Sequence, residues 1–263
     1  FFDHFLKGEA NGWDERAPVR VEVRESLTEY SVYEAADWPI PGTQYRELYL
    51  DPDAGKLELQ ARPKANEASY DALTGDLTFD VVFEENTELT GNMKLKLWVS
   101  ADEGDDMDLF VGVRKIDTEG REVTFFAKTG YTKGPVAMGW LRASQRALDP
   151  ERSTPAQPVL THEEPAPLTP GDIVPVEIEI LPSSTLFKAG ETLQLVIQGR
   201  DLFEHPALAH ARPPRGGPGG GDLAAGPPGR DKGCLSWPCL ASPGRACSAT
   251  DDQHNSSHKI CCQ

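Results

Sequence analysis

The first 205 residues contain no cysteine, and the chain has no apolar run of about 18 residues. The first absence means that this part needs no disulfide framework, and the second excludes a membrane-spanning helix. No basic segment followed by an apolar stretch is visible, so there is no sign of a signal peptide and the cytoplasm is the default expectation. The chain begins with Phe1 instead of Met, and we interpret it as a fragment or a processed piece.

Basic residues are also scarce, with 26 Lys and Arg against 42 Asp and Glu and a formal net charge of −16. Because binding to phosphate needs clustered Lys and Arg, this balance argues against a nucleic-acid partner. Hydrophobic residues make up 38% of the chain, which is enough for a core.

The composition changes abruptly after His205. Residues 206–263 contain 9 Gly, 8 Pro and all five Cys, but no Val, Phe or Tyr. Such a segment cannot bury enough apolar surface to offset its chain entropy, so we predict disorder from about Pro206 onward. We interpret the change as a frameshift, a retained intron or a mis-joined gene model. An uninterrupted spliced message across codons 205–215 would refute this interpretation.

The rest of the chain has the pattern of an all-β protein with one short helix. Phe1, Phe2, Phe5 and Leu6 share one helical face before Gly8, which predicts a helix at the start. Apolar and charged residues then alternate with period two, which predicts strands at 19–24, 30–34, 46–50, 56–60, 77–83, 93–99, 107–116, 123–128, 173–180 and 192–198.

Two segments lack that alternation. The pattern of residues 137–148 fits a short helix or an irregular strand, and residues 150–175 hold seven Pro, which predicts an extended surface connection. About ten strands with little helix predict a two-sheet sandwich, most simply a jelly roll.

The chain contains no Gly-x-Ser-x-Gly turn of the kind that exposes a hydrolase nucleophile. Ser144 lacks the flanking glycines, so a structural hydroxyl is favoured over a nucleophile. An acidic cluster could hold Ca²⁺, but its spacing is not that of an EF-hand and a solvated turn is favoured; it comprises Asp102, Glu103, Asp105, Asp106 and Asp108.

The tail offers further candidates. Cys234, Cys239, His254 and His258 approach a zinc spacing, but the insert between the pairs contains Pro243 and Gly244 and is a poor helix former. The remaining candidates are weaker. Asn255 begins a glycosylation sequon, and three lone histidines lie near proline, His162 and His205 before the tail and His210 within it. A run of glycines resembles a phosphate loop, but no strand precedes it and no Lys-Ser/Thr follows; it comprises Gly216, Gly217, Gly219, Gly220 and Gly221. We therefore predict no catalytic, cofactor-binding or metal-binding residue in this chain.

Several short motifs, in their order along the chain, resemble the CocE/NonD hydrolase family, which includes Xaa-Pro dipeptidyl-peptidases. These motifs are FFDHFLKG (1–8), NGW (11–13), DMDLF (106–110), GWLRAS (139–144), RALD (146–149), EP (164–165), LTPG (168–171), PSS (182–184) and GRD (199–201). The resemblance implies a remnant of an α/β-hydrolase domain at 1–12, a galactose-binding-like jelly roll at 13–205 and the divergent tail at 206–263.

The resemblance also implies a function. The chain would be the non-catalytic C-terminal domain of a serine hydrolase whose parent cleaves peptide, amide or ester bonds, and its partner would be the missing α/β-hydrolase domain. No catalytic residue can be carried over, because no position of this chain matches one. The family's final strands are replaced by the tail, so we expect open strand edges and partly uncovered Leu193, Leu195 and Ile197.

Two alternatives stay open at this point. One is a free-standing carbohydrate-binding module, for which Trp38, Trp98 and Trp140 are candidates, although core packing is commoner for tryptophan in strands. The other is a degenerate translation product without function.

Overall fold

The structure is a computed structural model, and it describes residues 1–61, 67–127, 132–203, 221–223 and 234–239. Strands dominate it, as the alternation predicts. The strands are β1 (Val19–Arg24), β2 (Tyr30–Ala35), β3 (Gln44–Asp51), β4 (Lys56–Glu58), β5 (Ala68–Tyr70), β6 (Asp76–Val82), β7 (Thr87–Ala101), β8 (Asp108–Ile116), β9 (Glu122–Val123), β10 (Ala137–Arg142), β11 (Val174–Phe187), β12 (Thr192–Gln198), β13 (Gly221–Leu223) and β14 (Cys234–Cys239). The helical elements are α1 (Phe2–Lys7) and the 3-10 turns η1 (Trp13–Glu15) and η3 (Ala143–Gln145).

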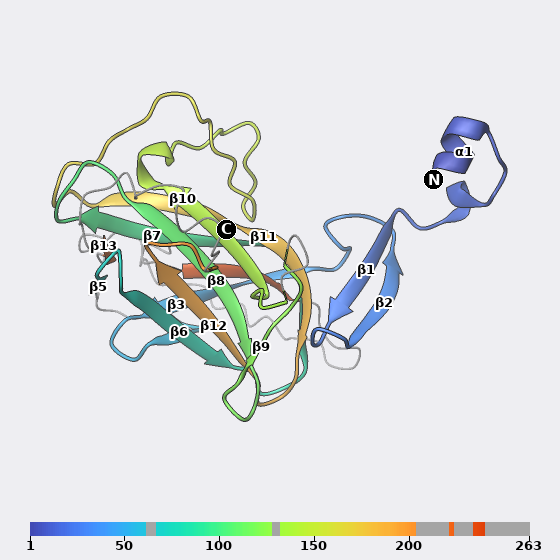
Figure 1. Ribbon diagram of the computed structural model, residues 1–263, viewed down its shortest axis with the longest axis horizontal. Helices are drawn as coiled ribbons and strands as arrows, with labels where there is room; N and C mark the ends of the chain where they lie inside the picture. The colour runs from blue at the N-terminus through green and yellow to red at the C-terminus, as the bar shows by residue number, and fades with distance from the viewer. Residues whose placement is uncertain (62–66, 128–131, 204–220, 224–233, 240–263) are drawn as a thin grey trace, which may run out of the picture.

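The strands form two facing layers (Figure 1). One layer has the order β10-β8-β12-β6, and the other has the order β3-β14-β7-β11, with the β1-β2 hairpin attached at the edge of β11. The short strand β4 lies between β6 and β3 and joins the two layers into one hydrogen-bonded path. This arrangement confirms the predicted all-β sandwich.

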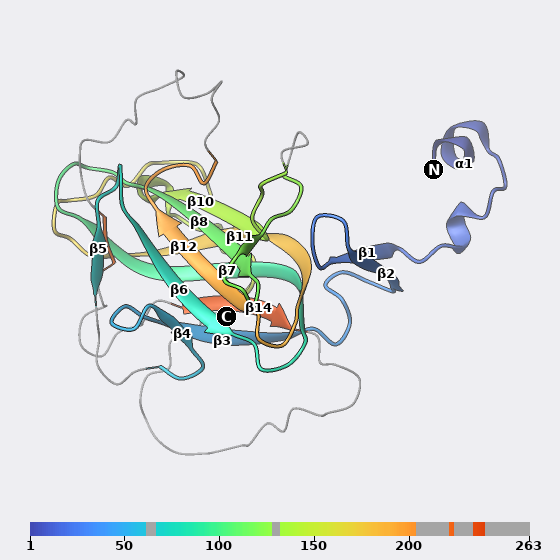
Figure 2. The ribbon, with the colours of Figure 1, turned by 60° about the horizontal axis from the view of Figure 1, so that its bottom comes forward.

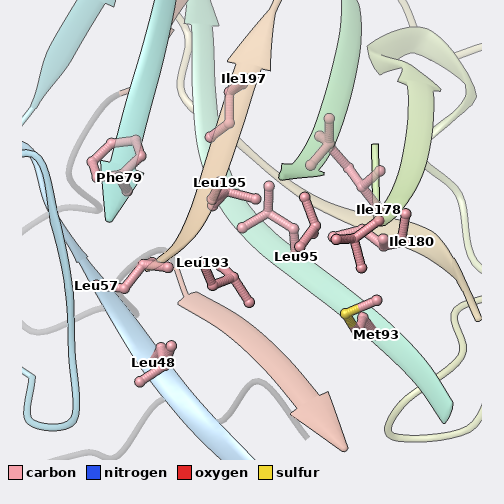
Figure 3. Close-up of a cluster of buried hydrophobic side chains, with 14 of the residues drawn as sticks. Leu48, Leu57, Phe79, Met93, Leu95, Ile178, Ile180, Leu193, Leu195 and Ile197 are labelled. Atoms are coloured by element: carbon pink, nitrogen blue, oxygen red, sulfur yellow. The ribbon is translucent and has the colours of Figure 1, made fainter. Parts of the chain in front are cut away.

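Apolar side chains from both layers fill the space between them (Figure 3). Leu195 of β12 and Leu95 of β7 come from opposite layers, and both are fully buried. The expectation that Leu193, Leu195 and Ile197 would be partly uncovered is wrong, since each has 0% exposure. β12 is paired with β6 on one edge and with β8 on the other, so it lies inside its layer and its apolar face meets the opposite sheet.

One lysine lies in this interior. Lys115 of β8 has a side chain that is 1% exposed, and its Nζ lies 2.8 Å from Oε2 of Glu191. The same ammonium donates hydrogen bonds to the carbonyl oxygens of Glu25 and Leu186, at 3.0 and 2.7 Å. All three ammonium protons therefore have acceptors, which is the condition for keeping such a charge inside a protein.

The β1–β2 hairpin and α1 extend away from the sandwich (Figure 1). β1 meets β11 through a single parallel pair, Arg24 with Thr185. Nη2 of Arg24 donates to the carbonyl of Val136 and to Oγ of Ser183, at 3.1 and 2.8 Å. Burial lowers the pKa of this guanidinium from its ordinary value. Tyr33 of β2 also donates to Oε1 of Glu88 at 2.9 Å, and Glu25 in the hairpin turn bonds Lys115 and Lys188. The attachment thus depends on a few side-chain contacts and on a small apolar cluster around Val21, Val23, Ile40 and Leu186.

The predicted N-terminal helix is present as α1, and it ends at Gly8, whose φ of 70° is the left-handed conformation that glycine adopts at low cost. Residues 137–148, which the sequence left undecided, form strand β10 followed by the 3-10 turn η3. Two local predictions are wrong: the strand expected at 123–128 is only the two-residue β9, and the three-residue β5 was not expected.

Two short segments differ from the tail that we predicted to be disordered. β13 pairs with β5 on one side and with β7 on the other. β14 lies between β3 and β7 (Figure 2). These tail segments form strands because the edges of β3, β5 and β7 offer unpaired N–H and C=O groups, and any extended segment can pair with such an edge. The other residues after 203 lie outside the described part of the chain. Over the described residues, every helix is too short or too polar to cross a bilayer.

Candidate functional site

The family-like motifs, far apart in the sequence, meet at one end of the sandwich. Asp106 lies just before β8, and Ser144 lies in η3 just after β10, the strand that pairs with β8. Oγ of Ser144 donates to Oδ2 of Asp106 at 2.6 Å, and the backbone N–H of Ser144 donates to Oδ1 at 2.9 Å. The N–H of Met107 also donates to Oδ1 at 2.9 Å. The Asp106 carboxylate therefore joins the start of β8 to the end of β10.

A second carboxylate strengthens the same corner. Nε and Nη2 of Arg142 donate to the two oxygens of Asp108 at 2.7 and 2.8 Å, which is the parallel geometry that a guanidinium and a carboxylate share. The hydrogen bonds from Asp108 and its negative charge raise the pKa of Arg142. Arg142 and Asp108 are opposite each other in the β10–β8 ladder, so the pair follows directly from the strand register.

These contacts define the surroundings of Ser144. Its hydroxyl donates to a carboxylate, and the residue is only 5% exposed. A nucleophilic serine instead needs a general base and access to substrate. None of the hydrogen bonds of Ser144 within the described residues involves a histidine. The structural role that the sequence favours for this hydroxyl agrees with its surroundings.

The acidic cluster has the same explanation. The carboxylate oxygens of Asp106 and Asp108 accept hydrogen bonds from donors of the chain itself. Across the described ranges, no group of three His, Cys, Asp or Glu side chains is placed to hold a metal ion. The backbone oxygen of Asp105 accepts from the N–H of Leu168 at 2.7 Å, which anchors the proline-rich connection at this corner.

We expect Asp106→Ala to lower the free energy of unfolding by about 2–3 kcal/mol, because it leaves three part-buried donors, two of Ser144 and one of Met107, without an acceptor. Urea denaturation followed by tryptophan fluorescence measures the loss. Asp105→Ala is the matched control, since that side chain is exposed, and it should change stability by less than about 0.5 kcal/mol. Equal effects of the two substitutions would contradict the structural role of Asp106.

A groove of about 570 Å³ runs beside β10, over the outer face of β11. Its lining includes Trp140 and His162 together with Glu177 and Glu179. Glu177 already pairs with Lys94, at 2.8 Å, and Gln157 donates to Glu179 at 3.0 Å. The groove thus has a mixed polar and apolar lining with an exposed aromatic ring at its side, and two of its carboxylates already have partners within the chain.

The three tryptophans proposed as sugar platforms differ in exposure. Trp140 is 56% exposed, Trp38 is 40% exposed, and Trp98 is 7% exposed and belongs to the buried set. Trp140 lines the groove beside β10, and Trp38 lines a groove of about 640 Å³ with Tyr45; Gln157 contributes to both grooves. Because Trp98 is buried, the three rings do not form one exposed binding platform.

Most tail candidates cannot be placed. His205, His210, His254 and His258, the glycines 216–220 and Asn255 lie outside the described residues. Cys234 and Cys239 are the two ends of strand β14, which puts their Cα atoms about 17 Å apart. Two cysteine ligands of one zinc ion must lie much closer than this. Strand β14 therefore keeps Cys234 and Cys239 too far apart to bind the same zinc ion. Gly221 begins β13, which pairs with β5 and β7.

Sequence reasoning did not find the contact between Asp106 and Ser144, since 38 residues separate them. The only available signal was the order of the motifs around these two residues.

Comparison with known proteins agrees with this geometry. Residues 11–206 match the model of the X-Pro dipeptidyl-peptidase C-terminal non-catalytic domain. A CocE/NonD family hydrolase from Staphylococcus aureus has 38% sequence identity and a TM-score of 0.84, over 91% of this chain and 44% of that chain. An aminopeptidase from a Thaumarchaeota archaeon shares the fold, with a TM-score of 0.60 at 17% identity over 92% of this chain and 43% of its own.

A curated relative from Mycobacterium bovis, named "Putative serine esterase", is 24% identical over 81% of this chain and 37% of its own length. The chain thus spans less than half of each relative. The matched region also contains the corner of Asp106 and Ser144 and every described strand from β1 to β12. On these grounds, the chain belongs to the family of X-Pro dipeptidyl-peptidase C-terminal non-catalytic domains.

Proposed function

We propose that this chain serves as the C-terminal β-sandwich of a serine hydrolase of the CocE/NonD type, whose parent acts on peptide, amide or ester bonds. A separate α/β-hydrolase domain of the parent supplies the serine that attacks the carbonyl, the histidine that moves the proton and the aspartate that orients it. The sandwich packs on that domain and forms part of the wall of the substrate cleft.

One observation carries the proposal: the match to a non-catalytic domain covers residues 11–206, and the solved relative at 38% identity is a CocE/NonD hydrolase of which this chain spans 44%. The chemistry of the described residues supports it, because Ser144 is buried and bonded to Asp106. A free-standing carbohydrate-binding module is not favoured, since the match is to a domain of a hydrolase family and Trp98, one of the three candidate tryptophans, is buried.

The test measures whether the chain holds an activated serine. We expect no labelling by a fluorophosphonate probe and no turnover of p-nitrophenyl acetate or of an Xaa-Pro p-nitroanilide, because no described serine has a histidine base. The Staphylococcus aureus hydrolase serves as the positive control under the same conditions. Labelling of Ser144, or turnover that Ser144→Ala abolishes, would overturn the proposal.

A further inference from the structure

Strand β7 has two edges that are filled from different parts of the chain. One edge pairs with β11 over twelve positions, from Val174 opposite Val99 to Phe187 opposite Thr87. In the described residues, the other edge pairs only with β13 and β14, at three positions each. Both of these strands come after residue 206, where the match to the family ends. Among the described residues, the family-matched region therefore supplies no strand for this edge of β7, and the edge is filled by segments that follow it.

The same two tail strands also complete a pairing on their other side. β14 pairs with six residues of β3, from Gln44 to Tyr49, and β13 pairs with β5. β3 and β7 are thus joined through β14, and no direct ladder between them occurs in the described strand order. One strand, β14, separates β3 from β7 and pairs with both, so the space between them has hydrogen-bonding groups on both sides (Figure 2).

The register places this slot directly over the core. Leu235 of β14 is opposite Leu48 of β3 and Leu95 of β7, and both of those leucines have 0% exposure. Figure 3 shows Leu48 and Leu95 on the two strands that flank the slot. An empty slot would open the core at this point, so an occupant is needed for the sandwich to close.

We propose that the β3–β7 slot is a strand-acceptor site, and that Cys234–Cys239 occupies it as a replaceable closing strand. The recognition is through the backbone, as in other cases of strand addition to a sheet edge, so the slot accepts an extended segment supplied by the same chain or by a separate peptide. Since the occupant is joined to the sandwich only through the rest of the tail, it binds as an intramolecular ligand whose local concentration depends on that tether.

The first experiment uses the full chain with one proline. Ser236 pairs with both Glu47 and Lys94, so its backbone lies inside the ladder, and Ser236→Pro removes a donor there and restricts φ. We expect the melting temperature to fall by about 5 °C or more, with faster amide exchange in β3 and in β7. Ser248→Pro, the same change outside β14, is the control and should match the parent chain.

The second experiment supplies the strand separately. A synthetic peptide with the sequence of residues 233–240, carrying serine in place of both cysteines, should bind the Ser236→Pro chain with 1:1 stoichiometry and restore amide protection in β3 and β7. The same peptide should not bind the parent chain, in which Cys234–Cys239 already fills the slot.

The outcomes separate cleanly. Unchanged stability and exchange in Ser236→Pro would overturn the placement of the closing strand, and loss of protection that the peptide does not restore would overturn the replaceable occupant. If Ser236→Pro does not fold, amide exchange of the parent chain tests the placement of the closing strand. In an unoccupied slot, the β3 amides that face it would exchange as fast as those of an open edge, and this result would overturn the proposal. None of these results depends on hydrolase activity, so the proposed function stands or fails separately.

Discussion

Replacing Lys115 with methionine should lower the free energy of unfolding by about 3–5 kcal/mol, as is typical when one partner of a buried ion pair is removed. The substitution leaves the Glu191 carboxylate without the ammonium at 2.8 Å, and it leaves the carbonyl groups of Glu25 and Leu186 without their donor. Urea denaturation followed by circular dichroism measures the change.

Two further variants make this test specific. Lys188→Met removes an ion pair with Glu25 whose lysine side chain is 51% exposed, and it should change stability by at most about 1 kcal/mol. In the Lys115→Met background, Glu191→Leu should recover part of the loss, because it removes the uncompensated charge. A Lys115→Met chain as stable as the Lys188→Met chain would show that the buried pair contributes little.

The second large effect is expected at Gly139, where β10 passes very close to β11. A Cβ atom built on Gly139 would lie 2.0 Å from the carbonyl oxygen of Glu179 and 3.2 Å from Cα of Ile180. Both contacts involve backbone atoms, so no side chain can rotate away to relieve them. We expect Gly139→Ala to force the two strands apart and to lower the free energy of unfolding by about 3 kcal/mol or more.

Gly120→Ala is the appropriate comparison for this substitution. Gly120 has nothing within 4 Å of an added Cβ, but its φ of +81° is unfavourable for alanine, at a cost of about 1 kcal/mol. Denaturation of the two variants in parallel therefore separates the steric term at Gly139 from backbone strain. Equal losses would indicate that the close approach of β10 to β11 relaxes without cost.

The sequence predicts strands best where alternation and flanking turns agree. In β12, Leu193, Leu195 and Ile197 share the buried face, and the observed strand covers the predicted residues 192–198, although Val196 on the other face is buried too. β7 is longer than predicted, because Thr90 and Asn92 are buried polar residues that interrupt the apolar signal at its start. β11 also extends beyond its prediction, across Pro182 and an irregularity between Ile180 and Ser183.

The buried ion pair and the contacts of the candidate site could be predicted only in part. Lys115 has the same parity along β8 as Leu109, Val111 and Val113, all of which face the core, so its burial was readable from the alternation. Its partner Glu191 was not, because the pair depends on how β12 starts relative to β8. The contact between Asp106 and Ser144 likewise depends on the β8–β10 register, which the alternation alone does not specify.

The attachment of the β1–β2 hairpin has a mechanical consequence. β11 is held to β7 by a ladder of twelve positions, whereas it meets β1 through the one pair at Arg24 and Thr185. A force pulling Phe1 away from the sandwich would be borne by the few side-chain contacts of Arg24, Tyr33 and Glu25 and by the apolar cluster near Leu186, whereas the long ladders would share their load over many bonds. Under tension, the hairpin should therefore detach as one unit at low force, before the sandwich itself begins to rupture.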